Sequence, residues 1–135
     1  MTESNKKENI SEEIKRAEEA WKAFELLSQQ SLLKDAVSRL YYFLLHYIRA
    51  LLLTESLEPK THEGALRLFS LHFVKAGIFE PKTGHIFSRL MKLREEADYN
   101  PSYVFTQDDI EELQQEAKGF SSLLKDYLVR EGWVA

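Results

Sequence analysis

Cysteine is absent from this chain of 135 residues, and glycine and proline are scarce, with five and three copies. The absence of cysteine excludes disulfides and thiolate zinc sites, and it fits a reducing compartment. Because glycine and proline are the residues that most disfavour helix interiors, their scarcity favours long helices. The expected fold class is therefore all-α, and the length predicts a single domain with a core of its own.

Long apolar runs are also missing. The first ten residues, MTESNKKENI, contain no apolar signal core, and the most apolar stretch, residues 40–53, is interrupted by His46 and Arg49. That stretch is too short to span a bilayer, so we expect no membrane association and a cytoplasmic protein. The net charge of -4 gives no general attraction to nucleic acid. No DNA binding is expected, although a local basic cleft stays open as an alternative.

Five segments carry apolar residues at intervals of three and four, the spacing of one face of a helix. The predicted helices cover residues 11–28, 32–55, 62–75, 82–97 and 107–127. The second is apolar around most of its circumference, which predicts a central helix surrounded by the others. The expected organisation is a flexible N-terminus at residues 1–10, a helical bundle at 11–130 and a C-terminal tail at 131–135.

Three of the expected helix starts carry capping residues. Ser11 is followed by two acids, which suits the positive end of a helix dipole. Thr61 follows the break at Pro59, and Thr106 stands three residues before Asp109, the spacing of a capping box. These positions predict N-caps for the first, third and fifth helices.

A polar stripe crosses the otherwise apolar central helix. At about 100° per residue, Arg39, Tyr42, His46 and Arg49 fall within about 80° of one another. Two guanidiniums, a phenol and an imidazole aligned in this way can hold an anion such as a phosphate. The alternative is a wet seam in which the arginines pair with acids of neighbouring helices, because an unpaired buried charge is costly.

Two further segments carry candidate binding residues. In PKTHEG, at residues 59–64, His62 stands at a helix N-terminus, where anions are favoured; the alternative is that the segment only caps the helix. In LREEADYNPSY, at residues 93–103, we expect Arg94 in the last turn of a helix and Asp98 and Tyr99 in the turn that follows. An arginine near a helix C-terminus also has an ordinary dipole explanation.

Other familiar chemistries are missing from the sequence. There is no glycine-rich phosphate loop and no GxSxG elbow. The four histidines do not form an HExxH pair, so neither a metal site nor a cofactor is expected.

Three blocks taken in order resemble the HEPN superfamily, and within it the small stand-alone HEPN proteins. They are SRLYYFLLHYIRALLL at 38–53, EPKTHEGALRLFSLHFVKAG at 58–77 and LREEADYNPSYVF at 93–105, and the resemblance covers about residues 11–128. It implies an antiparallel up-and-down bundle of about five helices that commonly forms a homodimer. It also implies a minimal nucleotidyltransferase as partner protein, in a toxin-antitoxin or defence-like pair.

The resemblance implies two kinds of activity. Many HEPN proteins are metal-independent ribonucleases with an Arg-x4-6-His motif; here Arg94 matches the arginine and Tyr99 stands at the position of the histidine. The function expected first is a module that binds a nucleotide or RNA. The alternatives are a ribonuclease with Arg94 and Tyr99 as catalytic residues, and a scaffold without a ligand. The expected nucleotide- or RNA-binding residues are Arg39, Tyr42, His46, Arg49, His62, Arg94 and Asp98.

Overall fold

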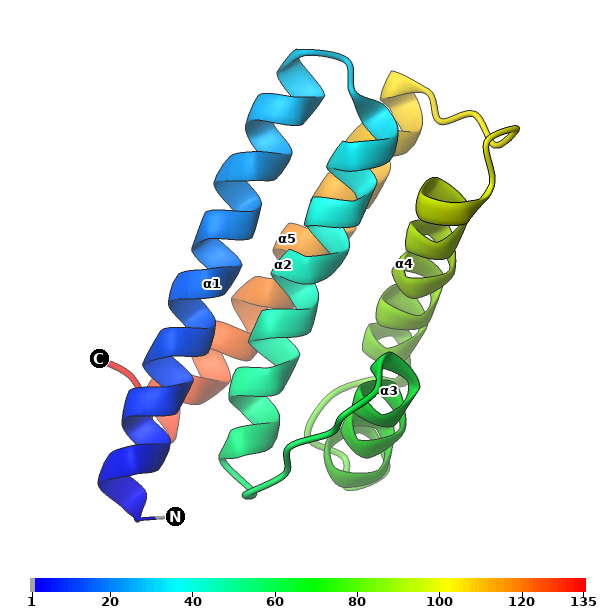
Figure 1. Cartoon of the computed structure of the whole chain (residues 1–135). Helices are drawn as coiled ribbons and strands as arrows, with labels where there is room; N and C mark the ends of the chain where they lie inside the picture. The colour runs from blue at the N-terminus through cyan, green and yellow to red at the C-terminus, as the bar shows by residue number, and fades with distance from the viewer. Residues whose placement is uncertain (1) are drawn as a thin grey trace.

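The computed structural model describes residues 2–135 as a bundle of antiparallel helices (Figure 1). Along the chain these are α1 (Glu3–Gln29), α2 (Leu33–Leu53), α3 (His62–Phe69), the π-helical turn η1 (Ser70–Val74), α4 (Pro81–Tyr99) and α5 (Gln107–Arg130). The four long helices alternate in direction, and the short α3 lies in the connection between α2 and α4 (Figure 1). Residues 2–135 contain no strand, and the all-α bundle of five α-helices is confirmed.

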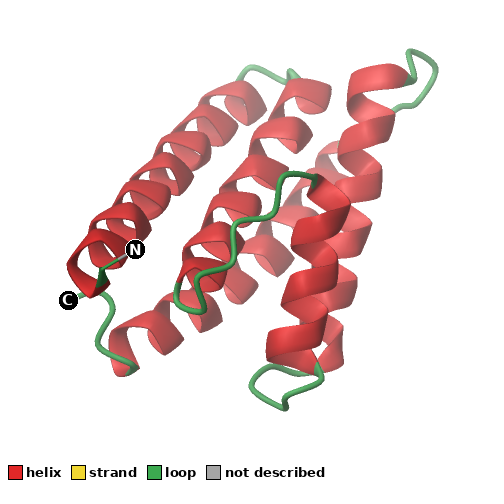
Figure 2. Cartoon of the chain, turned by 60° about the horizontal axis from the view of Figure 1, so that its bottom comes forward, coloured by secondary structure: helices red, strands yellow, loops and turns green. Residues whose placement is uncertain are grey.

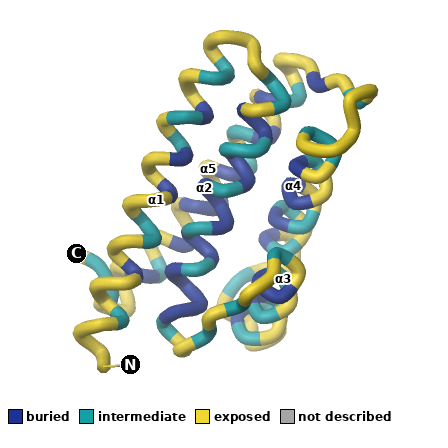
Figure 3. Tube along the Cα trace, viewed as in Figure 1, coloured by how far each residue is buried: buried dark blue, intermediate teal, exposed yellow. Residues whose placement is uncertain are grey.

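The helix α2 is the centre of the bundle. It packs against α1, α3, α4 and α5, and thirteen of its 21 residues are buried. In Figure 3 it is the helix with the most continuous buried surface, whereas α1 alternates between buried and exposed positions. The apolar circumference read from residues 32–55 therefore predicted its place correctly.

Capping side chains fix two of the helix starts at the expected residues. The Thr61 hydroxyl accepts a hydrogen bond of 2.9 Å from the Gly64 amide at the start of α3. At the start of α5, the Asp109 amide donates to the Thr106 hydroxyl at 3.1 Å and the Thr106 amide donates to the Asp109 carboxylate at 2.9 Å. The latter pair is a complete capping box.

The first helix begins earlier than the sequence predicted. It starts at Glu3 instead of near Ser11, with Thr2 as its N-cap. The physical reason is Ile10, which lies four residues before Ile14, extends the apolar face by one turn and is fully buried. Residues 3–10, expected to be flexible, are therefore helical, while Met1 lies outside the described residues.

Two other expected helices differ at their C-terminal parts. α4 continues to Tyr99, so Asp98 and Tyr99 lie in the helix and not in the turn after it. Between Ala97 and Pro101 the chain has no glycine or proline that would end the helix earlier. The third helix is divided into α3 and the π-helical turn. Across this division Phe69 and Phe73 both stay buried, with stacked rings 6.2 Å apart.

The C-terminal tail returns to the first helix. Figure 2 shows the two termini at the same end of the bundle. Trp133 packs in part against the core, and the Lys6 ammonium lies 5.9 Å from the centre of its ring, within reach of a cation–π contact.

Candidate functional site

Three helices contribute one polar cluster to the core, which we call the Arg94 cluster: Arg94, Tyr41, Tyr42 and His62. Tyr41 of α2 is fully buried, and its hydroxyl lies 2.7 Å from Nδ1 of His62, the first residue of α3. The guanidinium carbon of Arg94, on α4, lies 5.2 Å from the centre of the Tyr41 ring. The Tyr42 ring lies 5.3 Å from that of Tyr41 and 6.1 Å from that of His62.

Arg94 is a buried cation with one carboxylate partner. Only 8% of its side chain is exposed, and its Nη1 donates to the Asp98 carboxylate at 3.2 Å, one turn along α4. Its Nε is buried and has no hydrogen-bond partner among the described residues. Because a buried donor without an acceptor is costly and uncommon, this Nε–H is a candidate donor to a ligand.

The side chains of the Arg94 cluster differ in charge near pH 7. Burial by itself would lower the pKa of Arg94, but its hydrogen bond to the Asp98 carboxylate and the nearby tyrosines outweigh burial, and the pKa is raised. Burial raises the pKa of the Tyr41 hydroxyl, against the opposing effect of Arg94. Burial, followed by the positive charges of Arg94 and Arg49, lowers the pKa of His62. The cluster therefore combines a permanent cation with a neutral phenol and a neutral imidazole near pH 7.

The polar stripe of α2 extends this cluster along the helix. The guanidinium carbon of Arg39 lies 4.8 Å from the centre of the Tyr42 ring, and Arg49 acts electrostatically on both Tyr41 and His62. Within residues 2–135, neither Arg39 nor Arg49 forms an ion pair with a carboxylate. The acidic partners that a seam would require are therefore not found at these two arginines.

Within the stripe, His46 is the residue that pairs with an acid of a neighbouring helix, as the alternative of a wet seam expected. Its Nδ1 lies 2.8 Å from the Glu13 carboxylate of α1, and both side chains are 16% exposed. Glu13 also lies 3.8 Å from the Arg16 guanidinium. His46 is thus held toward α1, whereas Tyr42 is held toward His62 of α3.

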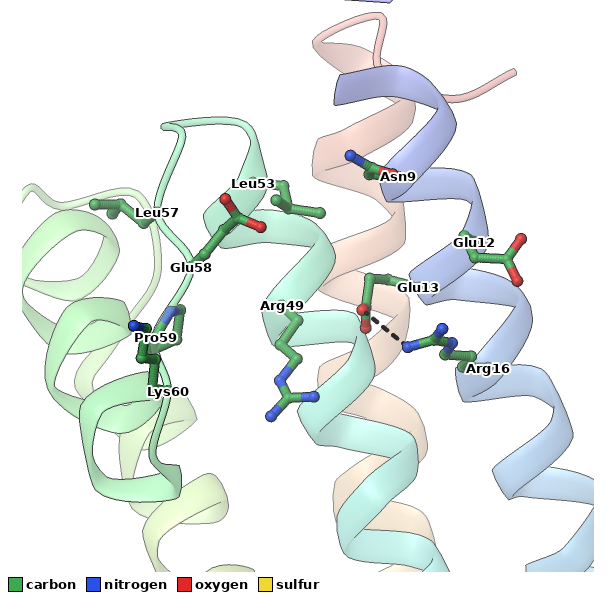
Figure 4. Close-up of a pocket in the computed structure, with 10 residues that line it drawn as sticks. All are labelled: Asn9, Glu12, Glu13, Arg16, Arg49, Leu53, Leu57, Glu58, Pro59 and Lys60. Atoms are coloured by element: carbon green, nitrogen blue, oxygen red, sulfur yellow. Dashed lines mark ion pairs between the residues drawn. The ribbon is translucent and has the colours of Figure 1, made fainter. Parts of the chain in front are cut away.

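A mixed-charge cavity of about 400 Å³ adjoins Arg49. Figure 4 shows the Arg49 side chain between the loop that carries Lys60 and the part of α1 that carries Glu13 and Arg16. Acidic and basic side chains balance in its wall. The charged lining residues are Glu12, Glu13, Arg16, Arg49, Glu58 and Lys60.

Tyr99 is the candidate residue that the structure leaves apart. It is 76% exposed, and five residues of helix turn it about 140° away from Arg94. No hydrogen bond or ring contact joins it to the Arg94 cluster within the described residues. The structure brings Arg39, Tyr42, Arg49, His62, Arg94 and Asp98 into one connected region, with Tyr99 outside it.

Tyr41 is a functional candidate that the sequence analysis missed. Its position on the apolar face of α2 is that of a core residue, and it was not distinguished from its apolar neighbours. The feature that could have identified Tyr41 is its hydroxyl, because a tyrosine in a fully buried position requires a hydrogen-bond partner.

Two features are absent from the part of the chain that the structure describes. Residues 2–135 contain no group of three or more histidine, aspartate or glutamate side chains arranged to hold a metal ion. No helix in the same range combines the length and the apolarity needed to cross a bilayer.

Comparison with known proteins decides the family. The model of the HEPN domain matches residues 10–127, nearly the whole bundle. The chain belongs to the HEPN family. Its whole Arg94 cluster and α2 stripe lie inside the HEPN domain, and the resemblance carried by the three sequence blocks is confirmed.

Curated relatives of this HEPN protein come from archaea and bacteria. The chain is 38% identical over 122 residues to a Methanocaldococcus jannaschii protein named "Putative toxin MJ0605", an alignment that covers 90% of each chain. A second protein of that organism, "Putative toxin MJ0142", is 29% identical over 91% of this chain and 84% of its own. A Thermotoga maritima protein named "UPF0332 protein" is 33% identical over 86% of this chain and 89% of its own.

Proposed function

We propose that this HEPN protein is the toxin-type member of a toxin-antitoxin pair, and that it binds a phosphate group of RNA or of a nucleotide at the Arg94 cluster. The observation that carries the binding site is the buried Nε of Arg94, a charged donor without an acceptor among the described residues. The toxin half is supported by the family membership and by the names of two relatives.

The surroundings of Arg94 suit a polyanion. Arg49 and Arg39 add two cations on the adjoining face of α2, without ion-paired carboxylates among the described residues. Tyr42 adds an aromatic ring between Arg39 and His62. Arginines that contact phosphates, together with an aromatic ring beside them, are the usual means of holding single-stranded RNA. This local arrangement explains how a protein of net negative charge would bind an anion.

The partners expected from the family complete the proposal. A homodimer and a complex with a minimal nucleotidyltransferase are the assemblies in which we expect the protein to work. Light scattering after size-exclusion chromatography measures the first, and co-purification with a nucleotidyltransferase from the same operon measures the second. A monomer at every concentration and no co-purification would contradict these assemblies.

The test of the site compares two arginines of α4. The binding of fluorescently labelled RNA oligonucleotides and of nucleotides is measured for the wild type, Arg94→Gln and Arg89→Gln. Arg89 is 46% exposed at its side chain and pairs with Glu112 and Glu116 of α5, so Arg89→Gln removes the same charge from the same helix away from the cluster. We expect Arg94→Gln to lose about 1.5–3 kcal/mol of binding free energy, a factor of about 10 to 150. Equal losses in both variants would contradict the site.

One observation favours ribonuclease activity as a second candidate. Tyr99 lies apart from Arg94, but a histidine, His62, lies beside it, since both contact Tyr41. An arginine and a histidine in one phosphate site are the components of RNA cleavage by acid–base catalysis. The test is RNA cleavage in EDTA by the wild type and by Arg94→Gln, and equal rates would rule out this activity at the cluster.

A further inference from the structure

Tyr41 has a single acceptor available for its hydroxyl proton. The side chain is fully buried on α2, and the only hydrogen-bond partner of the hydroxyl among the described residues is Nδ1 of His62, at 2.7 Å. Arg94 carries donors only, and neither of the other polar neighbours, Tyr42 and Glu95, is hydrogen-bonded to this hydroxyl among the described residues. Because a buried O–H group without an acceptor is costly, the hydroxyl must donate to His62.

This direction of donation fixes the proton of the imidazole. A neutral histidine has one protonated and one unprotonated ring nitrogen, and the nitrogen that accepts is the unprotonated one. The side chains around His62 are Tyr41, Tyr42 and Arg49 of α2 and Arg94 and Glu95 of α4. Burial is the largest influence on this ring, and the two cations outweigh the carboxylate, so the pKa of His62 is lowered and the ring is neutral near pH 7.

We propose that Tyr41 is a positioning residue that holds His62 as the tautomer protonated on Nε2, so that His62 presents a neutral N–H donor beside Arg94. The ligand class is then an anion whose oxygens only accept hydrogen bonds, such as an unprotonated phosphate or phosphodiester. The ligand part of this inference rests on the proposed function, whereas the tautomer is a property of the protein alone.

The tautomer decides which role His62 can take. With Nδ1 engaged by Tyr41 and Nε2 already protonated, the ring has no free lone pair with which to remove a proton from an RNA 2′-hydroxyl. The same ring is ready to donate to a phosphate oxygen without first being protonated. The arrangement therefore favours binding over catalysis by His62.

The direct experiment is nitrogen-15 NMR of the histidine ring at pH 7.5, in which the two neutral tautomers and the charged ring have different spectra. Comparison with His62→Gln assigns the His62 signals. We expect the wild type to show His62 protonated on Nε2 alone. A ring protonated on Nδ1, or charged at this pH, would overturn the inference, and this measurement on the wild type needs no variant of Tyr41 to fold.

Two phenylalanine variants separate positioning from packing. Tyr41→Phe keeps the ring but removes the donor, and we expect a mixture of His62 tautomers and about tenfold weaker binding of the labelled RNA. Tyr47→Phe is the matched control, because Tyr47 is also buried on α2 but packs on Phe43 and has no contact with His62. An unchanged tautomer in Tyr41→Phe would overturn the positioning role.

Amide replacements of His62 test the donor itself. The amide of glutamine reaches the position of Nε2, whereas that of asparagine reaches only the position of Nδ1. We expect His62→Asn to weaken RNA binding about tenfold and His62→Gln to weaken it less. Equal losses would refute the Nε2 donor, even if Arg94→Gln still weakens binding as expected and the proposed function stands. If no labelled RNA or nucleotide binds the wild type, the proposed function and the ligand class fall, whereas the NMR result still decides the tautomer.

Discussion

Asp98 occupies one of the donors of Arg94 that an anionic ligand would use. Its carboxylate accepts from Nη1 at 3.2 Å, and its own side chain is 31% exposed. Asp98→Asn keeps the shape and one acceptor but removes the negative charge. We therefore expect this variant to lower the stability of the free protein and to bind the anion more tightly.

The magnitudes follow from the geometry of this pair. A hydrogen bond between charged groups contributes about 1 kcal/mol more than a neutral one, so the free energy of unfolding should fall by about 1 kcal/mol. For a chain of 135 residues this lowers Tm by about 3–4 °C. Removing a competing charge near the guanidinium should strengthen binding by about 1 kcal/mol, which is about fivefold.

The assay combines thermal unfolding without ligand and RNA titration for the same preparations. Asp126→Asn is the matched control, because Asp126 is exposed on α5, has no ion pair among the described residues, and changes the net charge equally. We expect the control to keep the stability of the wild type within about 0.5 kcal/mol and to bind RNA as the wild type does. Weaker binding by Asp98→Asn than by the control would show that Asp98 orients Arg94 for the ligand and does not compete with it.

Three further predictions concern the ends of α3 and α5. Gly64→Ala would place a Cβ 2.8 Å from the Thr61 hydroxyl, so the cap must shift, and urea unfolding should show a loss of about 1 kcal/mol. Thr106→Ala breaks the capping box with Asp109 and should lower the free energy of unfolding by about 1 kcal/mol in the same assay. An unchanged free energy of unfolding would show that the capping box does not stabilise α5. The pKa of His62 is lowered in the folded state. As the pH falls below the ordinary pKa of histidine, the unfolded chain therefore binds a proton at His62 more readily than the folded protein does, and this favours unfolding. Stability should therefore fall between pH 7.5 and 5.5 more in the wild type than in His62→Gln, and an equal fall in both would contradict the lowered pKa.

The sequence predicted correctly those parts of the fold that depend on the spacing of apolar residues and on capping residues. The apolar circumference of residues 32–55 predicted the central α2, and Thr106 with Asp109 predicted the start of α5. The start of α1 was missed because the segment 3–10 is polar apart from Ile10. A single apolar residue in the correct register was sufficient to extend the helix.

The candidate site followed from the sequence only in part. Spacing along one helix placed Arg39, Tyr42, His46 and Arg49 in a stripe, but it could not show that His46 pairs with Glu13 while the arginines have no such partner. Contacts between α2, α3 and α4 depend on packing, so Tyr41 was not connected with His62, which is 21 residues away.

A crystal structure of the full chain with a bound nucleotide or short RNA would show whether Arg94 holds the phosphate of the ligand. We expect a phosphate oxygen within hydrogen-bond distance of Arg94 Nε, with His62 as a second donor. A phosphate bound only in the cavity between Arg16 and Lys60, with Nε of Arg94 still unpaired, would contradict it.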